Sequence, residues 1–463
     1  MMINWKREIE LRKEALIVDT CGLLKIKSVL DEEGATTEAP FGLAINEALQ
    51  FILQKGEQSG FDTKNVDGFA GHIEFGKGEE LIGILGHIDV VPEGDGWSSD
   101  PYSAEIRDGK IFARGAIDDK GPTMAAFYGM KIIKELGLPL SKRVRLIIGA
   151  DEESQWRCVD HYFQKEEMPI MGFAPDADFP IINAEKGICD MELVFPISSE
   201  ETSLISFQAG RRLNMVPDLA TAVVNIEEKE EVIHEFQLFL DRYDLVGETT
   251  IEEKGISFKL FGISAHGMEP NKGRNAGIYL AHFLKTIKLK GSGSEFVAFV
   301  DNHFYDDSRG LTLGLNYEDE QTGPLTINVG TLHFDESRRT IGLNLRYPVT
   351  YNFEDGLRTL EAAIAESGIV VDLKTHAKPH YVKADHPLIQ ILQKVYERQT
   401  GEVATLLSTG GGTYARSLQA GVAFGALFPG RPELAHQKDE YIDIEDLLKA
   451  ASIYAEAIYE LAK

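Results

Sequence analysis

Short apolar runs that each lead into a polar loop recur along this chain, and they constrain its fold more than any other feature. The runs at 81–86, 143–150 and 421–428 have the length and composition of buried strands. A helical pattern lies between the first two runs, with Pro122 at a plausible first helical position. Strands that alternate with helices are typical of α/β folds with a mainly parallel sheet.

The pattern of apolar and polar residues changes between about residues 186 and 381. Segments 255–262 and 340–349 alternate apolar and polar residues, which indicates half-exposed antiparallel strands. At 463 residues, the chain is also too long for one ordinary core. We therefore predict an α/β domain with a mixed, mostly parallel sheet flanked by helices over 1–185 and 382–463. A second, α+β domain with antiparallel sheets is expected to be inserted over 186–381.

Five residues with metal-binding side chains lie in loops that the strand pattern places near one another. They are His87, Asp118, Glu153, Asp176 and His436. In open α/β sheets, ligands gather beyond the carboxyl ends of the strands, and four of these five residues follow a strand-like run. Imidazole and carboxylate suit zinc, manganese or cobalt. Because one carboxylate can span two cations about 3.5–4 Å apart, the set predicts a centre of two divalent cations that activates water.

Two further carboxylates lie beside these ligands in the sequence. Asp89 is two residues beyond His87 and could accept the second N–H of its imidazole ring. If Glu153 binds metal, its neighbour Glu152 is available to take a proton from water and pass it to a leaving amine. This arrangement is typical of a hydrolase with a general base.

Each of these residues also has a simpler interpretation when it is considered alone. Asp118 could cap the helix that begins near Pro122, and residues 151–153 could form a solvated acidic turn. His436 could be a surface histidine, and His87 could be a core histidine. The coincidence of five ligand-type residues at strand ends favours the metal centre over these separate interpretations.

Longer motifs surround these residues: GHIDVVPEGDGW, ARGAIDDKGPT, GADEES, PDADFP, GISAHGMEP, STGGGTYAR and AHQKDE. They resemble the dinuclear zinc peptidase family of aminoacylases and glutamate carboxypeptidases, and most closely its PepV-type bacterial dipeptidases. The resemblance extends from about residue 10 to the C-terminus. It implies that His87 and Asp176 bind one cation. It also implies that Glu153 and His436 bind the other, with Asp118 bridging the two.

The resemblance carries further expectations for this centre. Asp89 would orient His87, Glu152 would be the general base, and the peptide bond between Asp118 and Asp119 would be cis. The expected cofactors are two zinc ions, with manganese or cobalt as alternatives.

In such enzymes the inserted domain is a lid that contributes catalytic groups. Asn214 and His266 resemble the pair that stabilises the tetrahedral oxyanion. Arg346 resembles the residue that binds the C-terminal carboxylate of the substrate. Further donors to that carboxylate could come from Gly411, Gly412 and Thr413. Without the resemblance, Arg346 would be interpreted as a salt-bridge partner, and Asn214 and His266 as loop residues.

The resulting hypothesis is a dipeptidase that hydrolyses unblocked dipeptides by a metal-bridging hydroxide, with Glu152 as the general base. Two alternatives stay open: an N-acyl-amino-acid amidohydrolase or desuccinylase of the same family, and a non-catalytic, metal-containing peptide-binding protein. The large inserted domain implies a monomer, because PepV-type enzymes supply the lid histidine within one chain.

Charge and composition restrict which partners and which cellular location are expected for the protein. Lys+Arg 47 against Asp+Glu 74 gives a formal net charge of −27, which disfavours nucleic acid and anionic membranes as partners. The N-terminal segment has no apolar signal region, and no segment approaches membrane-spanning length. Cys21, Cys158 and Cys189 form no CxxC pair. We therefore expect a cytoplasmic protein without a disulfide framework.

Overall fold

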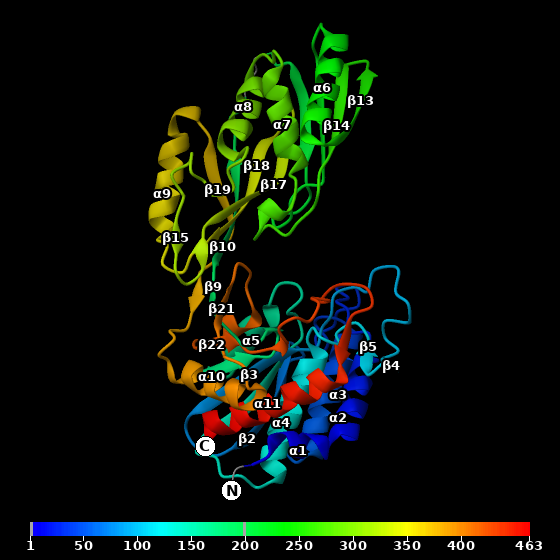
Figure 1. The fold of residues 1–463 in the computed structure, drawn as a ribbon, viewed down its shortest axis with the longest axis vertical. Helices are drawn as coiled ribbons and strands as arrows, with labels where there is room; N and C mark the ends of the chain where they lie inside the picture. Colours follow the sequence, from blue (N-terminus) through cyan, green and yellow to red (C-terminus); the bar gives the residue numbers. More distant parts are fainter. Residues whose placement is uncertain (1–2, 198–200) are drawn as a thin grey trace. The chain divides into compact units, whose positions relative to one another are not determined.

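The chain divides into two compact units in the computed structural model, which describes residues 3–197 and 201–463 (Figure 1). Unit 1 consists of Met1–Asn183, Tyr381–Leu407 and Thr413–Lys463. Unit 2 consists of Ala184–His380 and Ser408–Gly412.

Unit 1 is built on a nine-stranded mixed sheet in the order β1-β2-β6-β3-β7-β22-β9-β20, with β21 paired to β9. In that order the strands are Asp62–Val66, Ala70–Gly76, Arg143–Gly149, Leu81–His87, Met171–Ala174, Gly421–Ala423, Ile181–Glu185 and His380–Tyr381, and β21 is Leu406–Thr409. The central strands β6, β3, β7 and β22 run parallel, whereas β2 and β9 run antiparallel to their neighbours. The predicted mixed, mostly parallel sheet is confirmed, and β3 and β6 are the predicted runs at 81–86 and 143–150.

Helices flank this sheet. They are α1 (Trp5–Glu10), α2 (Lys13–Leu24), α3 (Leu43–Gln58), α4 (Lys120–Glu135), α5 (Arg157–Lys165), α10 (Pro387–Thr400) and α11 (Ile444–Ala462). Helix α4 packs against β3, α2 and α11, so that its residues are buried without interruption from Lys120 to Met130. Pro122 is the third residue of α4 rather than the predicted first, because the helix begins at Lys120. A small sheet of β4 (Glu105–Arg107), β5 (Lys110–Phe112) and β24 (Tyr441–Asp443) completes the unit.

The run at 421–428 is not the single strand that its composition predicts. It forms β22 and then β23 (Ala426–Leu427), which pairs with β8 (Ala177–Asp178) in a separate two-stranded sheet. Gly425 lies between the two strands with a φ of 79°, a left-handed conformation that interrupts strand geometry and that glycine adopts readily. The ring of Phe179 fills the space where a side chain at this position would stand.

Unit 2 is an antiparallel eight-stranded sheet in the order β13-β14-β12-β11-β17-β18-β10-β19. In that order the strands are Val246–Glu252, Gly255–Phe261, Leu219–Val224, Leu204–Ala209, Thr326–Phe334, Arg339–Tyr347, Gly187–Val194 and Val370–Ala377. Its helices are α6 (Lys229–Tyr243), α7 (Ala276–Thr286), α8 (Ser292–Phe304) and α9 (Phe353–Ile364), and α7 and α8 pack side by side (Figure 1). The predicted antiparallel sheet is confirmed. A two-stranded sheet of β15 (Glu318–Asp319) and β16 (Gly323–Pro324) accompanies it.

The two alternating segments of unit 2 differ in burial. Strand β14 alternates buried and partly buried residues from Ile256 onward, in line with its pattern, whereas β18 is buried along its whole length. The prediction for β18 was wrong because its polar side chains are paired inside the unit: Asn344 donates to Asp190 over 2.6 Å. Among the helices of the described residues, none combines the length and the apolar character needed to cross a membrane.

Candidate metal centre

Parallel strands of unit 1 deliver the predicted ligands to one edge of the sheet, where their carboxyl ends meet. His87 is the last residue of β3, and Glu153 lies four residues beyond β6. Asp176 lies two residues beyond β7. Asp118 lies in the loop between β5 and α4, and His436 lies in the loop between β23 and β24.

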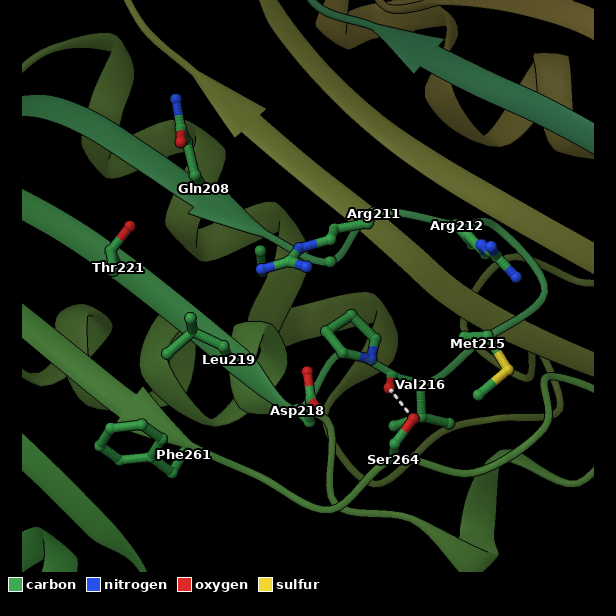
Figure 2. Close-up of a pocket in the computed structure, with 13 residues that line it drawn as sticks. Gln208, Arg211, Arg212, Met215, Val216, Asp218, Leu219, Thr221, Phe261 and Ser264 are labelled. Carbon is green, nitrogen blue, oxygen red and sulfur yellow. Dashed lines mark hydrogen bonds between the residues drawn. The ribbon is translucent and has the colours of Figure 1, made fainter. Parts of the chain in front are cut away.

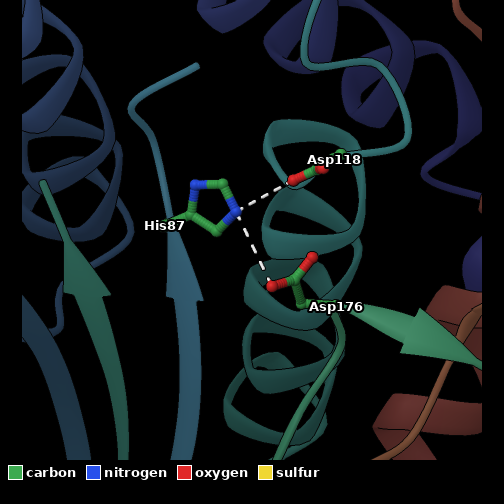
Figure 3. Close-up of side chains that lie close together, drawn as sticks. All are labelled: His87, Asp118 and Asp176. Atoms are coloured by element: carbon green, nitrogen blue, oxygen red, sulfur yellow. Dashed lines mark hydrogen bonds and ion pairs between the residues drawn. The ribbon is translucent and has the colours of Figure 1, made fainter. Parts of the chain in front are cut away.

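The five side chains form two groups that share Asp118. The first group is His87, Asp118 and Asp176, and the second is Asp118, Glu153 and His436. Figure 3 shows the first group, in which His87 Nε2 lies 3.0 Å from Asp118 Oδ1 and 3.7 Å from Asp176 Oδ2. In the second group, His436 Nε2 lies 3.1 Å from Asp118 Oδ2 and 3.0 Å from Glu153 Oε2. Each carboxylate oxygen of Asp118 therefore faces a different histidine.

These spacings suit divalent cations. Ligand atoms about 2.0–2.2 Å from a tetrahedral cation lie about 3.3–3.6 Å from one another, close to the distances in both groups. Glu153 Oε1 is buried and has no hydrogen-bond partner among the described residues, so this acceptor is available to a cation. The two groups could hold two cations bridged by Asp118.

Backbone and carboxylate atoms of Asp89 hold the histidine and the acidic turn. His87 Nδ1 lies 3.0 Å from the carbonyl oxygen of Asp89, so Nδ1 is the donor and Nε2 keeps its lone pair for a ligand. The Asp89 carboxylate lies farther from the ring, at 3.5 Å. Its two oxygens accept the backbone N–H groups of Glu152 and Glu153, over 3.1 and 3.0 Å.

Sequence reasoning missed the role of Asp151 in this turn. Its side chain is buried and accepts from Arg157 N, Nε and Nη2 over 3.1, 2.8 and 2.8 Å, and also from Ser154 Oγ. The turn at residues 151–153 is therefore held by hydrogen bonds to Asp89, Ser154 and Arg157 rather than fully solvated. An aspartate with an arginine six positions later was the only available signal.

The segment at the start of α4 also contributes to the centre. The Asp118–Asp119 peptide bond is cis, as the resemblance implies. Asp119 is the N-cap of α4, but its carboxylate makes no capping bond to the helix backbone. Instead, Asp119 Oδ2 accepts from Thr123 Oγ1 over 2.7 Å and from the backbone N–H of His87 over 3.2 Å.

The charged side chains of the cluster shift one another's pKa values. Hydrogen bonds that His436 donates to the carboxylates of Asp118 and Glu153 raise the pKa of this histidine to about 10. Burial raises the pKa values of Glu152 and Glu153. Burial also acts on Asp118, but its bonds to His436 and His87 hold the pKa of that carboxyl well below its usual range. Cations and protons therefore compete for the same ligand atoms.

Two buried charged residues behind Asp118 were also missed. Arg114 and Glu440 form an ion pair of 2.6 Å, and Glu440 accepts from the backbone N–H groups of Ile117 and Asp118. Both residues lie inside the quoted motifs ARGAIDDKGPT and AHQKDE, which was the signal that could have found them.

Unit 2 brings the predicted lid residues together in two places. Asn214 and His266 lie in adjacent loops, since Met215 and His266 form a β-bridge and Gly267 N donates to Asn214 O over 2.7 Å. Arg346, on β18, donates to Asn344 Oδ1 over 2.7 Å and to the carbonyl of Gly410 over 3.1 Å.

The remaining predicted residues lie in the segment that follows β21. Gly411 and Gly412 belong to unit 2, and Gly411 N donates to Thr409 Oγ1 over 3.0 Å. Thr413 belongs to unit 1. Within unit 2, Arg346 and this glycine segment are therefore neighbours through Gly410.

A pocket of about 640 Å³ borders the loops that carry Asn214 and His266. Figure 2 shows Arg212, two residues before Asn214, and Met215, the residue after it, on the wall of this pocket. Ser264 lines the same wall and donates to the carbonyl of Val216 over 3.2 Å, which joins the two loops.

Comparisons with known proteins place this chain in a family. The sequence profile of the "Peptidase family M20/M25/M40" matches residues 83–460. A Bacillus subtilis (strain 168) protein named "Putative dipeptidase YtjP" is 56% identical to this chain over 467 residues, and the match covers 100% of both chains.

Solved structures share the fold at low sequence identity. Aminopeptidase PepT from Bacillus cereus ATCC 10987 matches with a TM-score of 0.57 at 16% identity, covering 97% of this chain and 99% of that chain. The dipeptidase Dug1p from Saccharomyces cerevisiae matches with a TM-score of 0.57 at 13% identity, covering 98% and 97%. The profile match and the close relative confirm the resemblance read from the motifs. This chain is a member of peptidase family M20/M25/M40.

Proposed function

We propose that this peptidase is a metal-dependent dipeptidase that hydrolyses the peptide bond of unblocked dipeptides. The observation that carries the proposal is the pair of ligand groups that share Asp118, with Glu152 next to one ligand, Glu153. The name of the 56% identical relative from Bacillus subtilis supports dipeptides as the substrate class.

Two divalent cations fit the centre, with zinc as the first candidate and manganese or cobalt as alternatives. One would be held by His87, Asp176 and Asp118, and the other by Glu153, His436 and Asp118. When bound, they would supply Lewis acidity that polarises the scissile carbonyl and lowers the pKa of water.

Glu152 is the proposed general base. It would take a proton from the attacking water and deliver that proton to the leaving amine as the C–N bond breaks. Two contacts that hold its backbone support this role: Asp89 accepts the backbone N–H of Glu152, and the neighbouring Asp151 carboxylate accepts from Arg157. Glu153, the next residue, is left to bind a cation.

Residues of unit 2 are proposed to bind the substrate and the transition state. His266 and Asn214 would donate to the tetrahedral oxyanion, and one such donor is worth about 3 kcal/mol. Arg346 would pair with the C-terminal carboxylate of the dipeptide, since a guanidinium forms a fork with two parallel hydrogen bonds. Gly411 and Gly412 of unit 2 are the proposed additional donors to this carboxylate, together with Thr413 of unit 1.

We also propose that residues 186–381 act as the lid of a catalytic domain formed by 1–185 and 382–463. The enzyme is proposed to be a cytoplasmic monomer without nucleic-acid or membrane partners. The formal net charge of −27 supports the last point, because such a surface repels polyanions.

The proposal is tested by a substrate panel. Chelator-stripped protein is assayed before and after addition of zinc, manganese or cobalt, with free dipeptides, a tripeptide, and N-acetyl and N-succinyl amino acids. Cleavage confined to free dipeptides and dependent on added metal is the expected result. Cleavage of blocked substrates alone would indicate an amidohydrolase or desuccinylase. Cation and peptide binding without any cleavage would indicate a binding protein.

A further inference from the structure

A buried ion pair lies directly behind the shared ligand Asp118. Glu440 is 0% exposed and Arg114 is 1% exposed, and the distance from Arg114 Nη1 to Glu440 Oε2 is 2.6 Å. Removing two charges from water costs free energy that their attraction often fails to repay, so a buried pair is weak evidence for a purely stabilising role. The contacts of both side chains indicate another role.

Glu440 uses its second oxygen to hold the backbone of the shared ligand. Glu440 Oε1 accepts from the N–H of Ile117 over 2.9 Å and from the N–H of Asp118 over 3.3 Å. The carbonyl oxygen of Glu440 accepts from Ala113 N over 3.1 Å. One residue from the C-terminal part of the chain thus fixes the loop that presents Asp118 to both histidines.

Arg114 joins that loop to the two loops that follow the histidine ligands. Its Nη1 donates to the carbonyl of Gln437, the residue after His436, over 3.2 Å. Its Nη2 donates to the carbonyl of Glu93, in the loop after His87, over 3.3 Å. A guanidinium can reach both carbonyls and the carboxylate at once because its five N–H groups point in fixed, divergent directions.

We propose that the Arg114–Glu440 pair positions Asp118 and His436, and that it thereby sets the affinity of the centre for divalent cations. Neither residue is a ligand; both act through the backbone of ligand-bearing loops. The inference rests on the metal centre of the proposed function, and it adds to that centre the residues that keep its shared ligand in place.

The test uses substitutions that keep the charge of each side chain and change its length or its donor geometry. Glu440→Asp shortens the side chain by one methylene and withdraws the carboxylate from the N–H groups of Ile117 and Asp118. Arg114→Lys keeps the positive charge but loses the fork that reaches the two carbonyls. The matched controls are Glu74→Asp and Arg145→Lys, in an ion pair of 2.6 Å on β2 and β6 that contacts none of the five ligands.

Two properties of each full-length, chelator-stripped variant are measured. The first is the affinity for zinc by calorimetry with a competing chelator, and the second is the visible spectrum of bound cobalt, which reports ligand geometry. Thermal midpoints of the stripped proteins are recorded alongside. We expect Glu440→Asp to lower zinc affinity about 10- to 100-fold, as for other partners that orient ligands. We expect a smaller loss for Arg114→Lys, altered cobalt spectra for both, and wild-type affinity and spectra for the controls.

Wild-type affinity and spectra in Glu440→Asp and Arg114→Lys would overturn the inference. So would an equal loss of affinity in the controls, since affinity would then only follow stability. If Glu440→Asp fails to fold, Arg114→Lys and its control decide alone. A wild-type protein that binds no divalent cation would refute the inference together with the metal centre. The expected binding pattern in a protein that cleaves no dipeptide would refute only the proposed function.

Discussion

At the scale of single residues, Asp118 holds the candidate centre together, because each of its carboxylate oxygens faces a different histidine. Glu152 and Glu153 are neighbours in the sequence but differ in what they contact. The Glu153 carboxylate lies 3.0 Å from His436, as a ligand would, whereas the backbone N–H of Glu152 donates to Asp89. Substitutions of the two glutamates should therefore impair different properties of the protein, the rate of hydrolysis for Glu152 and the affinity for zinc as well for Glu153.

Glu152→Gln should lower the rate of dipeptide hydrolysis at least about 100-fold, because an amide cannot carry the proton from water to the amine. Its affinity for zinc should stay at the wild-type value. Glu153→Gln is the matched comparison and should lose zinc affinity as well as rate. Initial rates and calorimetric zinc titrations of both variants check this. A Glu152→Gln enzyme with near wild-type turnover would remove Glu152 from the proposed mechanism.

His72 should make the stability of unit 1 depend on pH. It is buried, with Nδ1 2.8 Å from Tyr162 Oη, and burial followed by the charge of Arg145 lowers its pKa from 6.5 to about 4. As the pH falls from 6.5 towards 4, the unfolded chain takes up a proton that the folded chain does not. The stability contributed by neutral His72 is present above pH 6.5 and is lost through that window.

Thermal midpoints measured in chelator between pH 7 and 4.5 test this prediction. The wild type should lose stability as the pH falls, and His72→Gln should show a shallower decline, because glutamine does not titrate. Parallel pH profiles for the two proteins would show that His72 is not responsible.

At the scale of elements, the parallel strands explain both what could be predicted and what could not. Strand β3 and the second half of β6, from Leu146 to Gly149, are buried on both faces and therefore appear in the sequence as apolar runs. The hydrophobic pattern does not predict the break between β22 and β23, because this break depends on the backbone conformation of Gly425. The burial of β18 was also not predicted, because the alternation of apolar and polar residues does not show whether the polar side chains are hydrogen-bonded inside the unit.

The packing of α4 on α11 depends on Gly129. A Cβ at this position would lie 2.9 Å from the backbone nitrogen of Ala455, so Gly129→Ala must push two helix backbones apart. Overpacking of this kind costs about 1–3 kcal/mol, which outweighs the helix propensity of about 1 kcal/mol that alanine adds. We expect a lower free energy of unfolding and a lower thermal midpoint.

Gly22→Ala in α2 is the matched control. Its Cβ would meet the far end of the Phe51 ring at 2.7 Å, and this partly exposed side chain can move aside. Its thermal midpoint should stay close to that of the wild type. Equal losses in the two variants would show that the close approach of α4 to α11 is not what requires glycine at 129.

At the scale of the whole molecule, the candidate centre is assembled from segments between residues 87 and 440 that only folding brings together. The residue types and motifs were enough to name the five ligand candidates in advance. They could not show that the carbonyl of Asp89 holds the ring of His87, that Arg157 fixes the acidic turn, or that Glu440 supports Asp118. Those contacts join positions whose spacing in the sequence follows no local period.

Metal-dependent dipeptidase activity is tested by titrating chelator-stripped protein with zinc while the hydrolysis of a free dipeptide is followed. We expect no hydrolysis before zinc is added, and a rate that rises with bound zinc and levels off at two equivalents, because two ligand groups share Asp118. Full activity in the stripped protein, or no activity when two equivalents are bound, would contradict this expectation.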